Sequence, residues 1–500
     1  MLPNLGRLSL QQADTRVVFR YNDKEYWDEK YPQIGDDRCA ICLGNIEEND
    51  NVAVLSCTHF FHEACIREWV VRNNRCPTCR EPLPPNDLER IKGPLTPEES
   101  FLEAAEEGDL AKVTQMLKDG IDVNAHDEDG KTALMSACAN EHAIVALALL
   151  ERTDIEVNLV NKYDNTALHW ASLKGMLEVV EKLIEKGADV NKQNEDGYTA
   201  LIGACDKGML EVVEKLIEKG ADVNVQGAYG NTALILACDR KHTDVALALL
   251  EDDNIKVNLV NNRGHTALHQ ASIKGMLAVV QKIIAKDADV NVRDKSGDTA
   301  LMIACIYRNT HVALALLESK DIEVDLANNR GKTALHQASR YEMLSIVEEL
   351  IEKRADVNKQ NEDGYTALFW ACFVKNTDIA LALLESKNID VDLANVVGNT
   401  ALHQASSQGM LSVVEKLIEK RADVNKQNRN GNTALFWACE NEQPDVARAL
   451  LESKDIKVDL ANIKGETALH RTSYQGMLKV VKELKTFFDV TNCTLRTSLN

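Results

Sequence analysis

Three features are missing from this chain of 500 residues, and each absence excludes a class of location or partner. No apolar run reaches the roughly 20 residues that a membrane-spanning helix needs, and no signal peptide or lipidation motif is present. Basic residues are in the minority: 57 Lys and Arg stand against 78 Asp and Glu, a net charge of −21. Because nucleic-acid binding requires a basic face, we expect neither nucleic acid nor a membrane as the main partner.

A disulfide framework is also missing. Of the 13 cysteines, six lie between residues 39 and 79, and Cys493 lies near the end. The other six each stand six residues after a recurring threonine, where sister segments have serine: Cys138, Cys205, Cys238, Cys305, Cys372 and Cys439. This pattern predicts small, buried, reduced side chains and a reducing compartment. We expect a cytoplasmic protein, with the nucleus, or the cytoplasm of a host cell if a virus or bacterium exports it, as further locations.

The most informative stretch runs from Cys39 to Arg80. It holds eight potential zinc ligands spaced C-x2-C-x14-C-x-H-x2-H-x2-C-x10-C-x2-C, namely Cys39, Cys42, Cys57, His59, His62, Cys65, Cys76 and Cys79. Thiolates and imidazoles in sets of four are what tetrahedral zinc takes. Eight ligands predict two closed, structural zinc sites with no open position for a catalytic water.

These residues resemble a RING finger of the type with two central histidines. The resemblance implies interleaved sites, one zinc held by Cys39, Cys42, His62 and Cys65 and the other by Cys57, His59, Cys76 and Cys79. A PHD finger would have its tryptophan just before the last cysteine pair, whereas Trp69 lies seven residues before Cys76, on an expected short helix HEACIREWVV. The single Cys–Cys, His–His set of a DNA-binding finger is absent.

RING fingers mostly act as ubiquitin ligases, without a nucleophile of their own, by holding a ubiquitin-charged conjugating enzyme in a reactive pose. The resemblance implies that Ile41, Trp69 and Pro77 contact the conjugating enzyme. It also implies that Arg80 bridges this enzyme and ubiquitin, a role that suits a planar guanidinium with several donors. The alternative is that Ile41 and Trp69 only pack the small domain and that Arg80 is an ordinary solvated residue.

The flanks of the RING-like stretch carry weaker signals. Residues 1–38 form an N-terminal extension in which RVVFRY, residues 16–21, could be a short strand. Residues 81–95 open with three prolines and no apolar period, which predicts a linker. Thr96, Pro97 and Glu99 then have the arrangement of a helix cap with proline in the first turn and a capping box.

The rest of the chain repeats itself. Thr-Ala-Leu recurs at steps of 33 or 34 residues, at Thr132, Thr166, Thr199, Thr232, Thr266, Thr299, Thr333, Thr366, Thr400, Thr433 and Thr467. The period, the motif G-x-T-A-L-H and the closing A-D-V-N resemble ankyrin repeats. The resemblance covers residues 97 to about 489 and implies an α-solenoid of about twelve repeats, followed by a disordered tail at 490–500. Histidines three residues after a threonine, such as His336, are expected to brace the loops and not to bind metal.

Ankyrin arrays bind partners on their concave face, and the resemblance places the positions seven and eight residues past each threonine there. These positions are small or polar in most repeats, but in three consecutive repeats they are Ile306 and Tyr307, Arg340 and Tyr341, and Phe373 and Val374. Exposed aromatic and arginine side chains favour an interface. Trp370 and Trp437 could border this cluster, and the alternative is that all eight side chains fill grooves between repeats.

The sequence therefore predicts a mainly α protein: a small cross-braced zinc RING domain at 39–80 and an ankyrin solenoid at 96–489. The function that this organisation favours is a ubiquitin ligase, with ubiquitin, a conjugating enzyme and a substrate on the concave face as partners. A zinc-containing ankyrin scaffold without ligase activity is the alternative, and intact Ile41, Trp69, Pro77 and Arg80 argue against it.

Overall fold

The computed structural model describes most of the repeat array and parts of the N-terminal region. The described residues are 18–20, 39–42, 51–55, 59–83, 95–474, 480 and 482. Several predictions lie outside them: Cys57, Cys493, most of the N-terminal extension, the middle of the linker, and the C-terminal tail. The chain divides into two compact units, residues 1–136 and 137–500.

A small sheet and one helix make up the described part of the RING-like region. Strands β1 (Val18–Arg20), β2 (Asn51–Val54) and β3 (Phe60–His62) form an antiparallel sheet in that order, and α2 (Glu63–Arg72) follows β3 directly. The strand at 18–20 lies within the segment RVVFRY, where a strand was possible. Among the described residues of this region, the buried side chains include Phe61, Ile66 and Val70. A domain of this length buries little apolar surface and commonly needs metal or disulfides for stability.

The repeat array begins at α4 (Pro97–Glu107), and its start confirms the predicted capping box. The Thr96 side chain accepts a hydrogen bond from the Glu99 backbone N–H at 3.1 Å, and the Glu99 carboxylate accepts one from the Thr96 N–H at 2.8 Å. Pro97 takes the first helical position, where its missing N–H leaves no unpaired donor. The helix α5 (Leu110–Lys118) packs against α4.

Each further repeat contributes a pair of short helices. The first helices of the pairs are α6 (Ala133–Ala139), α8 (Ala167–Leu173), α10 (Ala200–Lys207), α12 (Ala233–Asp239), α14 (Ala267–Lys274), α16 (Ala300–Ile306), α18 (Ala334–Arg340), α20 (Ala367–Phe373), α22 (Ala401–Gln408), α24 (Ala434–Glu440) and α26 (Ala468–Tyr474). The second helices are α7 (Ala143–Leu150), α9 (Leu177–Glu185), α11 (Leu210–Glu218), α13 (Thr243–Leu249), α15 (Leu277–Ala285), α17 (Thr310–Leu317), α19 (Leu344–Glu352), α21 (Thr377–Leu384), α23 (Leu411–Glu419) and α25 (Pro444–Leu451).

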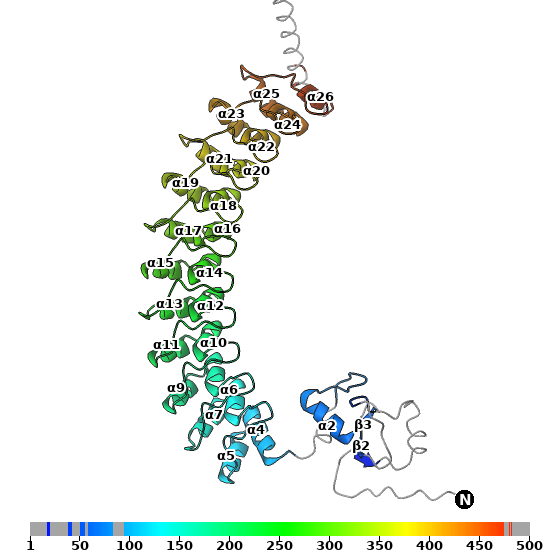
Figure 1. The fold of residues 1–500 in the computed structure, drawn as a ribbon, viewed down its shortest axis with the longest axis vertical. Coiled ribbons are helices and arrows are strands. Elements are labelled where there is room, and N and C mark those ends of the chain that lie inside the picture. Colours follow the sequence, from blue (N-terminus) through cyan, green and yellow to red (C-terminus); the bar gives the residue numbers. More distant parts are fainter. Residues whose placement is uncertain are drawn as a thin grey trace, which may run out of the picture. The chain divides into compact units, whose positions relative to one another are not determined.

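Within the second unit these helices stack in two rows, with first helices beside first helices and second beside second (Figure 1). Helices of seven to nine residues are not stable alone in water, so they depend on burying apolar surface against the next repeat. In α8 and α9 the residues that do this are Ala167, Leu168, Val179, Val180 and Leu183, all 2 % exposed or less. The same pattern recurs along the array, which explains the repeated sequence.

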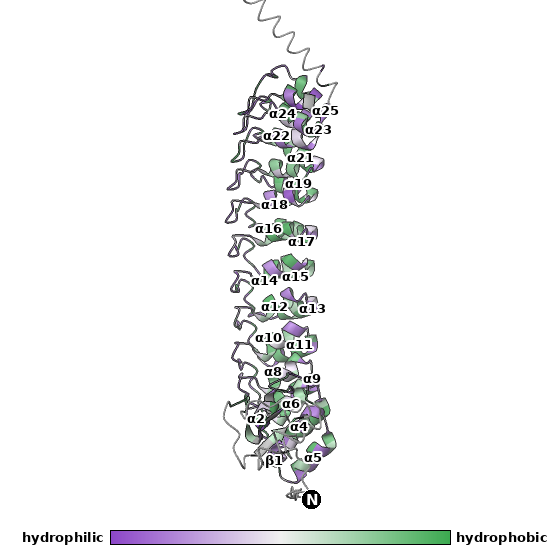
Figure 2. Ribbon diagram, turned by 90° about the vertical axis from the view of Figure 1, so that its right-hand side faces the viewer, coloured by the Kyte–Doolittle hydropathy of each residue, from purple (hydrophilic) through white to green (hydrophobic). Residues whose placement is uncertain are grey.

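The hairpin loops between repeats project to one side of the helices (Figure 2) and are joined to one another by backbone hydrogen bonds. The Glu195 N–H donates to the Tyr163 carbonyl at 3.0 Å, and the Asn262 N–H donates to the Tyr229 carbonyl at 2.9 Å. Asparagine side chains add a second link: the Asn191 amide donates to the Gly220 carbonyl at 3.2 Å, and its oxygen accepts from the Asp222 N–H at 2.7 Å. Neighbouring loops are therefore held in a fixed register.

The six cysteines that follow the repeat threonines are buried free thiols, as predicted. Burial raises the pKa of Cys138, Cys238, Cys305, Cys372 and Cys439 to about 12 and that of Cys205 further in the same direction. These thiols therefore stay protonated and act as small apolar side chains. Among the described residues, no helix is long and apolar enough to cross a membrane.

Candidate functional site

The first group of cysteine and histidine side chains joins two distant segments of the RING-like region. The potential ligand atoms of Cys39, Cys42, His62 and Cys65 all lie within 4.8 Å of one another. The Nδ1 atom of His62 is 3.3 Å from the Cys42 sulfur and 3.9 Å from the Cys65 sulfur. The end of β3 positions His62, and the first turn of α2 positions Cys65 beside it. The described turn at Cys39 to Cys42 supplies the other two side chains.

The second group comes from the segment before β3 and the segment after α2. The potential ligand atoms of His59, Cys76 and Cys79 also lie within 4.8 Å of one another. The eighth predicted ligand, Cys57, lies outside the described residues. The two groups interleave along the chain: His59 lies with Cys76 and Cys79, whereas His62 lies with Cys39 and Cys42. This is the arrangement that the RING resemblance implied.

The donor set fits zinc. Sulfur and imidazole nitrogen are the ligands of structural zinc, and four of them within one small space match its tetrahedral coordination. Burial tends to raise the pKa of the Cys39 thiol, but hydrogen bonds from the backbone at Cys42, Ile41 and His62 lower it to about 7. Burial and the neighbouring thiols raise the pKa of Cys65 to about 12. Cys39 and Cys42 therefore hinder the ionisation of Cys65, and a bound cation would relieve this repulsion.

The predicted docking residues flank these groups. Ile41 is half-buried in the turn between Cys39 and Cys42, Trp69 is half-buried on α2, and Pro77 is half-buried after Cys76. Two hydrogen bonds link α2 to the last pair of cysteines: the Trp69 indole N–H donates to the Arg75 carbonyl at 2.9 Å, and the Arg75 guanidinium donates to the Arg80 carbonyl at 3.0 Å. Trp69 therefore has a structural role as well as a half-exposed surface.

Arg80 has a fixed backbone and an exposed side chain. Its φ is 60°, and its N–H donates to the Cys76 carbonyl at 2.9 Å. A positive φ is uncommon for a residue with a Cβ and is kept only when neighbouring contacts require it. The turn around Cys76 and Cys79 thus orients Arg80 outward.

In the array, the threonine and histidine of each TALH motif are bonded as expected. The Thr333 N–H donates to His336 Nδ1 at 3.1 Å, and His336 Nε2 lies 2.9 Å from the Tyr365 carbonyl of the next repeat. The same bonds recur at His169, His269 and His403. Burial lowers the pKa of His269, His336 and His403 to about 4, so these rings are neutral braces.

Six of the predicted partner-binding residues lie at or just past the ends of α16, α18 and α20, whereas Trp370 and Trp437 lie in the middle of α20 and α24. Tyr307 and Phe373 are each 54 % exposed, whereas Ile306, Arg340, Tyr341, Val374, Trp370 and Trp437 are half-buried. The indole nitrogens of Trp370 and Trp437 are buried and have no hydrogen-bond partner among the described residues. These two tryptophans therefore partly fill the grooves between repeats, while Tyr307 and Phe373 stand in solvent.

Two residues that sequence reasoning missed also contact this cluster. Lys332 and Tyr365 each directly precede a repeat threonine. The Lys332 ammonium lies 5.5 Å from the centroid of the Trp370 ring, and the Tyr365 ring centroid lies 5.3 Å from it. Their fixed position in the repeat is the signal that could have found them, because the residue before each threonine lies at the base of the hairpin loop.

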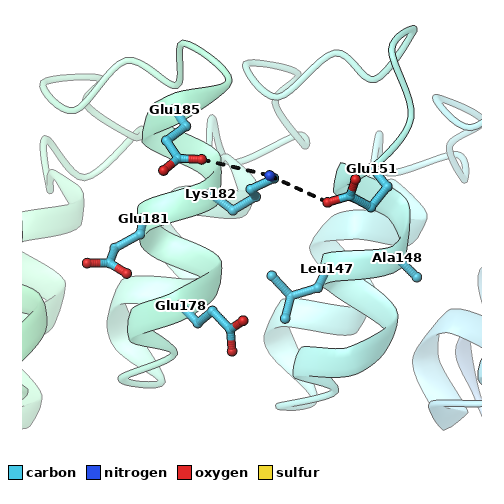
Figure 3. Close-up of a pocket in the computed structure, with 7 residues that line it drawn as sticks. All are labelled: Leu147, Ala148, Glu151, Glu178, Glu181, Lys182 and Glu185. Atoms are coloured by element: carbon cyan, nitrogen blue, oxygen red, sulfur yellow. Dashed lines mark ion pairs between the residues drawn. The ribbon is translucent and has the colours of Figure 1, made fainter.

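The second helices bear an acidic hollow on their outer side, between α7 and α9 (Figure 3). It is lined by Leu147, Ala148, Glu151, Glu178, Glu181, Lys182 and Glu185. Lys182 bridges Glu151 at 3.4 Å and Glu185 at 3.8 Å. This lysine neutralises part of the acidic charge and ties two repeats together, which is a structural role.

Comparison with known proteins agrees with both halves of this description. The family described as ankyrin repeats (3 copies) matches residues 101–194, 201–294, 268–361, 335–428 and 402–492, and the Ring finger domain family matches residues 37–80.

Curated relatives match parts of the chain. It is 31 % identical over 164 residues to the nuclear factor NF-kappa-B p105 subunit of Gallus gallus, covering 32 % of this chain and 17 % of that protein. It is 34 % identical over 148 residues to neurogenic locus notch homolog protein 1 of Xenopus laevis, covering 30 % and 6 %. It is 30 % identical over 183 residues to the B-cell lymphoma 3 protein homolog of Mus musculus, covering 35 % and 40 %.

The chain thus spans less than half the length of each of these relatives. The family matches cover most of the repeat region and the whole predicted RING segment. The chain belongs to the ankyrin-repeat family and carries a RING finger ahead of its repeats.

Proposed function

We propose that this chain is a ubiquitin ligase: its RING finger recruits a ubiquitin-conjugating enzyme, and its ankyrin array binds the protein substrate. The observation that carries the proposal is the pair of interleaved zinc-ligand groups, with Ile41, Trp69, Pro77 and Arg80 at their edges. A RING finger with these side chains has what it needs to bind a conjugating enzyme. No relative named above is a ligase by its name, so the proposal rests on the RING finger.

The zinc ions would have a structural role. One would be held by Cys39, Cys42, His62 and Cys65, and a second by Cys57, His59, Cys76 and Cys79. Zinc when bound supplies the cross-links that a core of this size cannot replace. The chain's own residues then act by position: Ile41, Trp69 and Pro77 bind the conjugating enzyme, and Arg80 donates hydrogen bonds that restrict the motion of the attached ubiquitin.

In the array, Ile306, Tyr307, Arg340, Tyr341, Trp370, Phe373, Val374 and Trp437 would contact the substrate. Clustered aromatic and arginine side chains with exposed edges are typical of the residues that dominate binding energy. A substrate bound there would meet the charged conjugating enzyme at high effective concentration, because both sites are on one chain. The buried free thiols support a reducing compartment such as the cytoplasm.

The test is autoubiquitination with purified chain, activating enzyme, ubiquitin and a panel of conjugating enzymes. Wild type should form ubiquitin chains and Cys39→Ser should not. Arg80→Ala should keep its zinc and slow ubiquitin discharge about tenfold to a hundredfold, since a hydrogen bond to a charged group contributes about 1.5–3 kcal/mol. Arg429→Ala, an exposed arginine in the array, is the matched control and should discharge ubiquitin at the wild-type rate.

No product across a broad panel, from protein that holds its zinc, would instead support a scaffold without ligase activity. Unchanged discharge by Arg80→Ala would remove this side chain from the mechanism. Alanine keeps the Cβ and therefore the same backbone cost at a φ of 60°, so a slower reaction cannot be ascribed to relief or increase of backbone strain.

A further inference from the structure

Three cations at the ends of first helices pair with an acid of the preceding repeat. Lys174 pairs with Glu141 at 2.9 Å, Arg240 with Asp206 at 2.7 Å, and Lys274 with Asp239 at 3.6 Å. The three bases occupy the same position, eight residues past their threonines. This face therefore supplies its own counter-ions across the repeats from α6 to α14.

The next repeats break this rule. At the position of Asp206 and Asp239, seven residues past the threonine, the ends of α14 and α16 have Ile273 and Ile306. Within the described residues 95–474, no carboxylate forms an ion pair with Arg340 or Lys332. The Arg340 guanidinium instead lies 4.7 Å from the centroid of the Trp370 ring and 5.6 Å from that of Tyr341.

The two cations share the same aromatic ring. The Lys332 ammonium is 5.5 Å from the Trp370 ring centroid, and Phe373 lies edge-on to that ring at 5.5 Å. Burial lowers the pKa of Lys332, with repulsion from Arg340 and Arg330 adding to the shift, while Asp363 and Asp298 oppose it. Two cations thus share one aromatic ring without a close ion pair, although the whole chain carries −21.

A guanidinium stacked on an indole still presents its N–H edge to an incoming carboxylate. Phe373 lies against the same Trp370 ring, and Tyr307 ends α16, the helix that packs against α18; both rings are exposed and offer apolar surface to a neighbouring side chain. We name Tyr307, Lys332, Arg340, Tyr341, Trp370 and Phe373 the Arg340 patch. We propose that the Arg340 patch binds an extended segment of a protein partner in which an Asp or Glu side chain lies next to an aromatic or aliphatic one.

This inference rests on the proposed function, since it names the chemistry of the segment that the array would bind. Arg340 stands seven residues past Thr333, one position before the place of Lys174, Arg240 and Lys274 in their repeats. An acid on the partner would give Arg340 the carboxylate that Lys174, Arg240 and Lys274 find within the array. Electrostatic complementarity of this kind gives specificity and depends on salt. The apolar neighbour supplies the area that a surface ion pair alone does not.

The experiment is a selection of random twelve-residue peptides displayed on phage, with the zinc-loaded full chain as bait. Retained peptides should be enriched in Asp or Glu adjacent to Phe, Trp or Leu. A labelled synthetic copy of one retained peptide should bind at least tenfold more weakly to Arg340→Glu. Its binding to wild type should also weaken at least tenfold when the acidic residues of the peptide are changed to amides. This change leaves the folding of the protein untouched.

Lys174→Ala is the matched control, since this lysine lies on the same face but has its own carboxylate; it should change the peptide affinity less than twofold. Retained peptides without an excess of carboxylates, or none retained, would overturn the inference, as would equal binding to Arg340→Glu. Ubiquitin discharge without substrate does not involve the Arg340 patch. Absence of ubiquitin discharge by the wild-type chain would refute the ligase function alone. Peptides that bind as well to Arg340→Glu as to wild type would refute only the Arg340 patch.

Discussion

At the scale of single residues, the hydrogen bonds around a buried histidine of this array determine its protonation state. His336 shows this most clearly. Its Nδ1 accepts from the Thr333 N–H and its Nε2 lies within hydrogen-bond distance of the Tyr365 carbonyl, so the ring must be neutral with its proton on Nε2. Protonation of Nδ1 would break the first bond and place a charge in an apolar surrounding.

This bonding predicts that acid destabilises the array. Burial lowers the pKa of His269, His336 and His403 to about 4 in the folded protein, against about 6.5 in an unfolded chain. Between these values the unfolded chain binds protons that the folded one does not, so stability falls as pH falls from about 6.5 to 4. Each histidine contributes up to about 1.4 kcal/mol per pH unit.

The measurement is urea denaturation at several pH values for wild type and His336→Gln. Glutamine offers an acceptor and a donor in place of the ring but binds no proton. The free energy of unfolding of His336→Gln should therefore depend less steeply on pH than that of wild type, by up to about 1.4 kcal/mol per pH unit. Carboxylates titrate alike in both proteins and cancel in the comparison. Parallel pH profiles would show that His336 takes up a proton in the folded state as readily as in the unfolded state.

At the scale of elements, some second helices of the array end in a turn that requires one residue with positive φ. The second helices of five sister repeats end in the same turn, and one equivalent position in it is at positive φ in all five: Gly187, Gly220, Asp287, Arg354 and Arg421. A Cβ built at Gly187 or Gly220 would meet no atom within 4 Å. Any penalty for a larger residue there is therefore a backbone penalty and not a steric clash with the fold.

The prediction is a reciprocal change in stability. Arg421→Gly should raise the free energy of unfolding by about 1 kcal/mol, because glycine adopts this left-handed conformation without the Cβ clash. Gly220→Arg should lower it by a similar amount. The urea midpoints of the two variants would test this.

Arg421→Ala is the control, since alanine keeps the Cβ and should gain little. A gain from alanine equal to that from glycine would mean that the arginine side chain, and not its backbone conformation, was the unfavourable feature.

At the scale of the whole molecule, two different sources of stability coexist. The described RING region has few buried side chains and two groups of thiols and imidazoles, whereas the array buries an apolar layer in every repeat. Metal bound by these groups would therefore contribute folding free energy to the RING region, whereas the array would be stable without it.

Chelation should separate the two. Removing zinc with a strong chelator should abolish ubiquitin transfer. Helical circular dichroism at 222 nm should fall by less than about a tenth, since every described helix except α2 belongs to the array. Re-addition of zinc should restore transfer. A large loss of helical signal on chelation would show that the array depends on the metal-binding domain for its stability.

Most of the fold was predictable because its signals are local or periodic. The capping box at Thr96, α2 with Trp69, the buried cysteines and the Thr–His bonds each depend on residues close in the chain or on a constant step of 33 or 34 residues. The two ligand groups were predictable for a similar reason, since metal ligands have characteristic spacings. The sequence by itself thus determined the domain types and the repeat register.

Only the tertiary structure decided which side chains meet across repeats. Lys332 lies 38 residues before Trp370, and no local pattern relates them, yet stacking brings the ammonium over the indole. Stacking likewise decided that Lys174 is neutralised by Glu141 whereas Arg340 lies on a ring. The physical reason is that charge balance depends on distances between repeats. A sequence pattern specifies each repeat, but those distances exist only once the repeats are packed together.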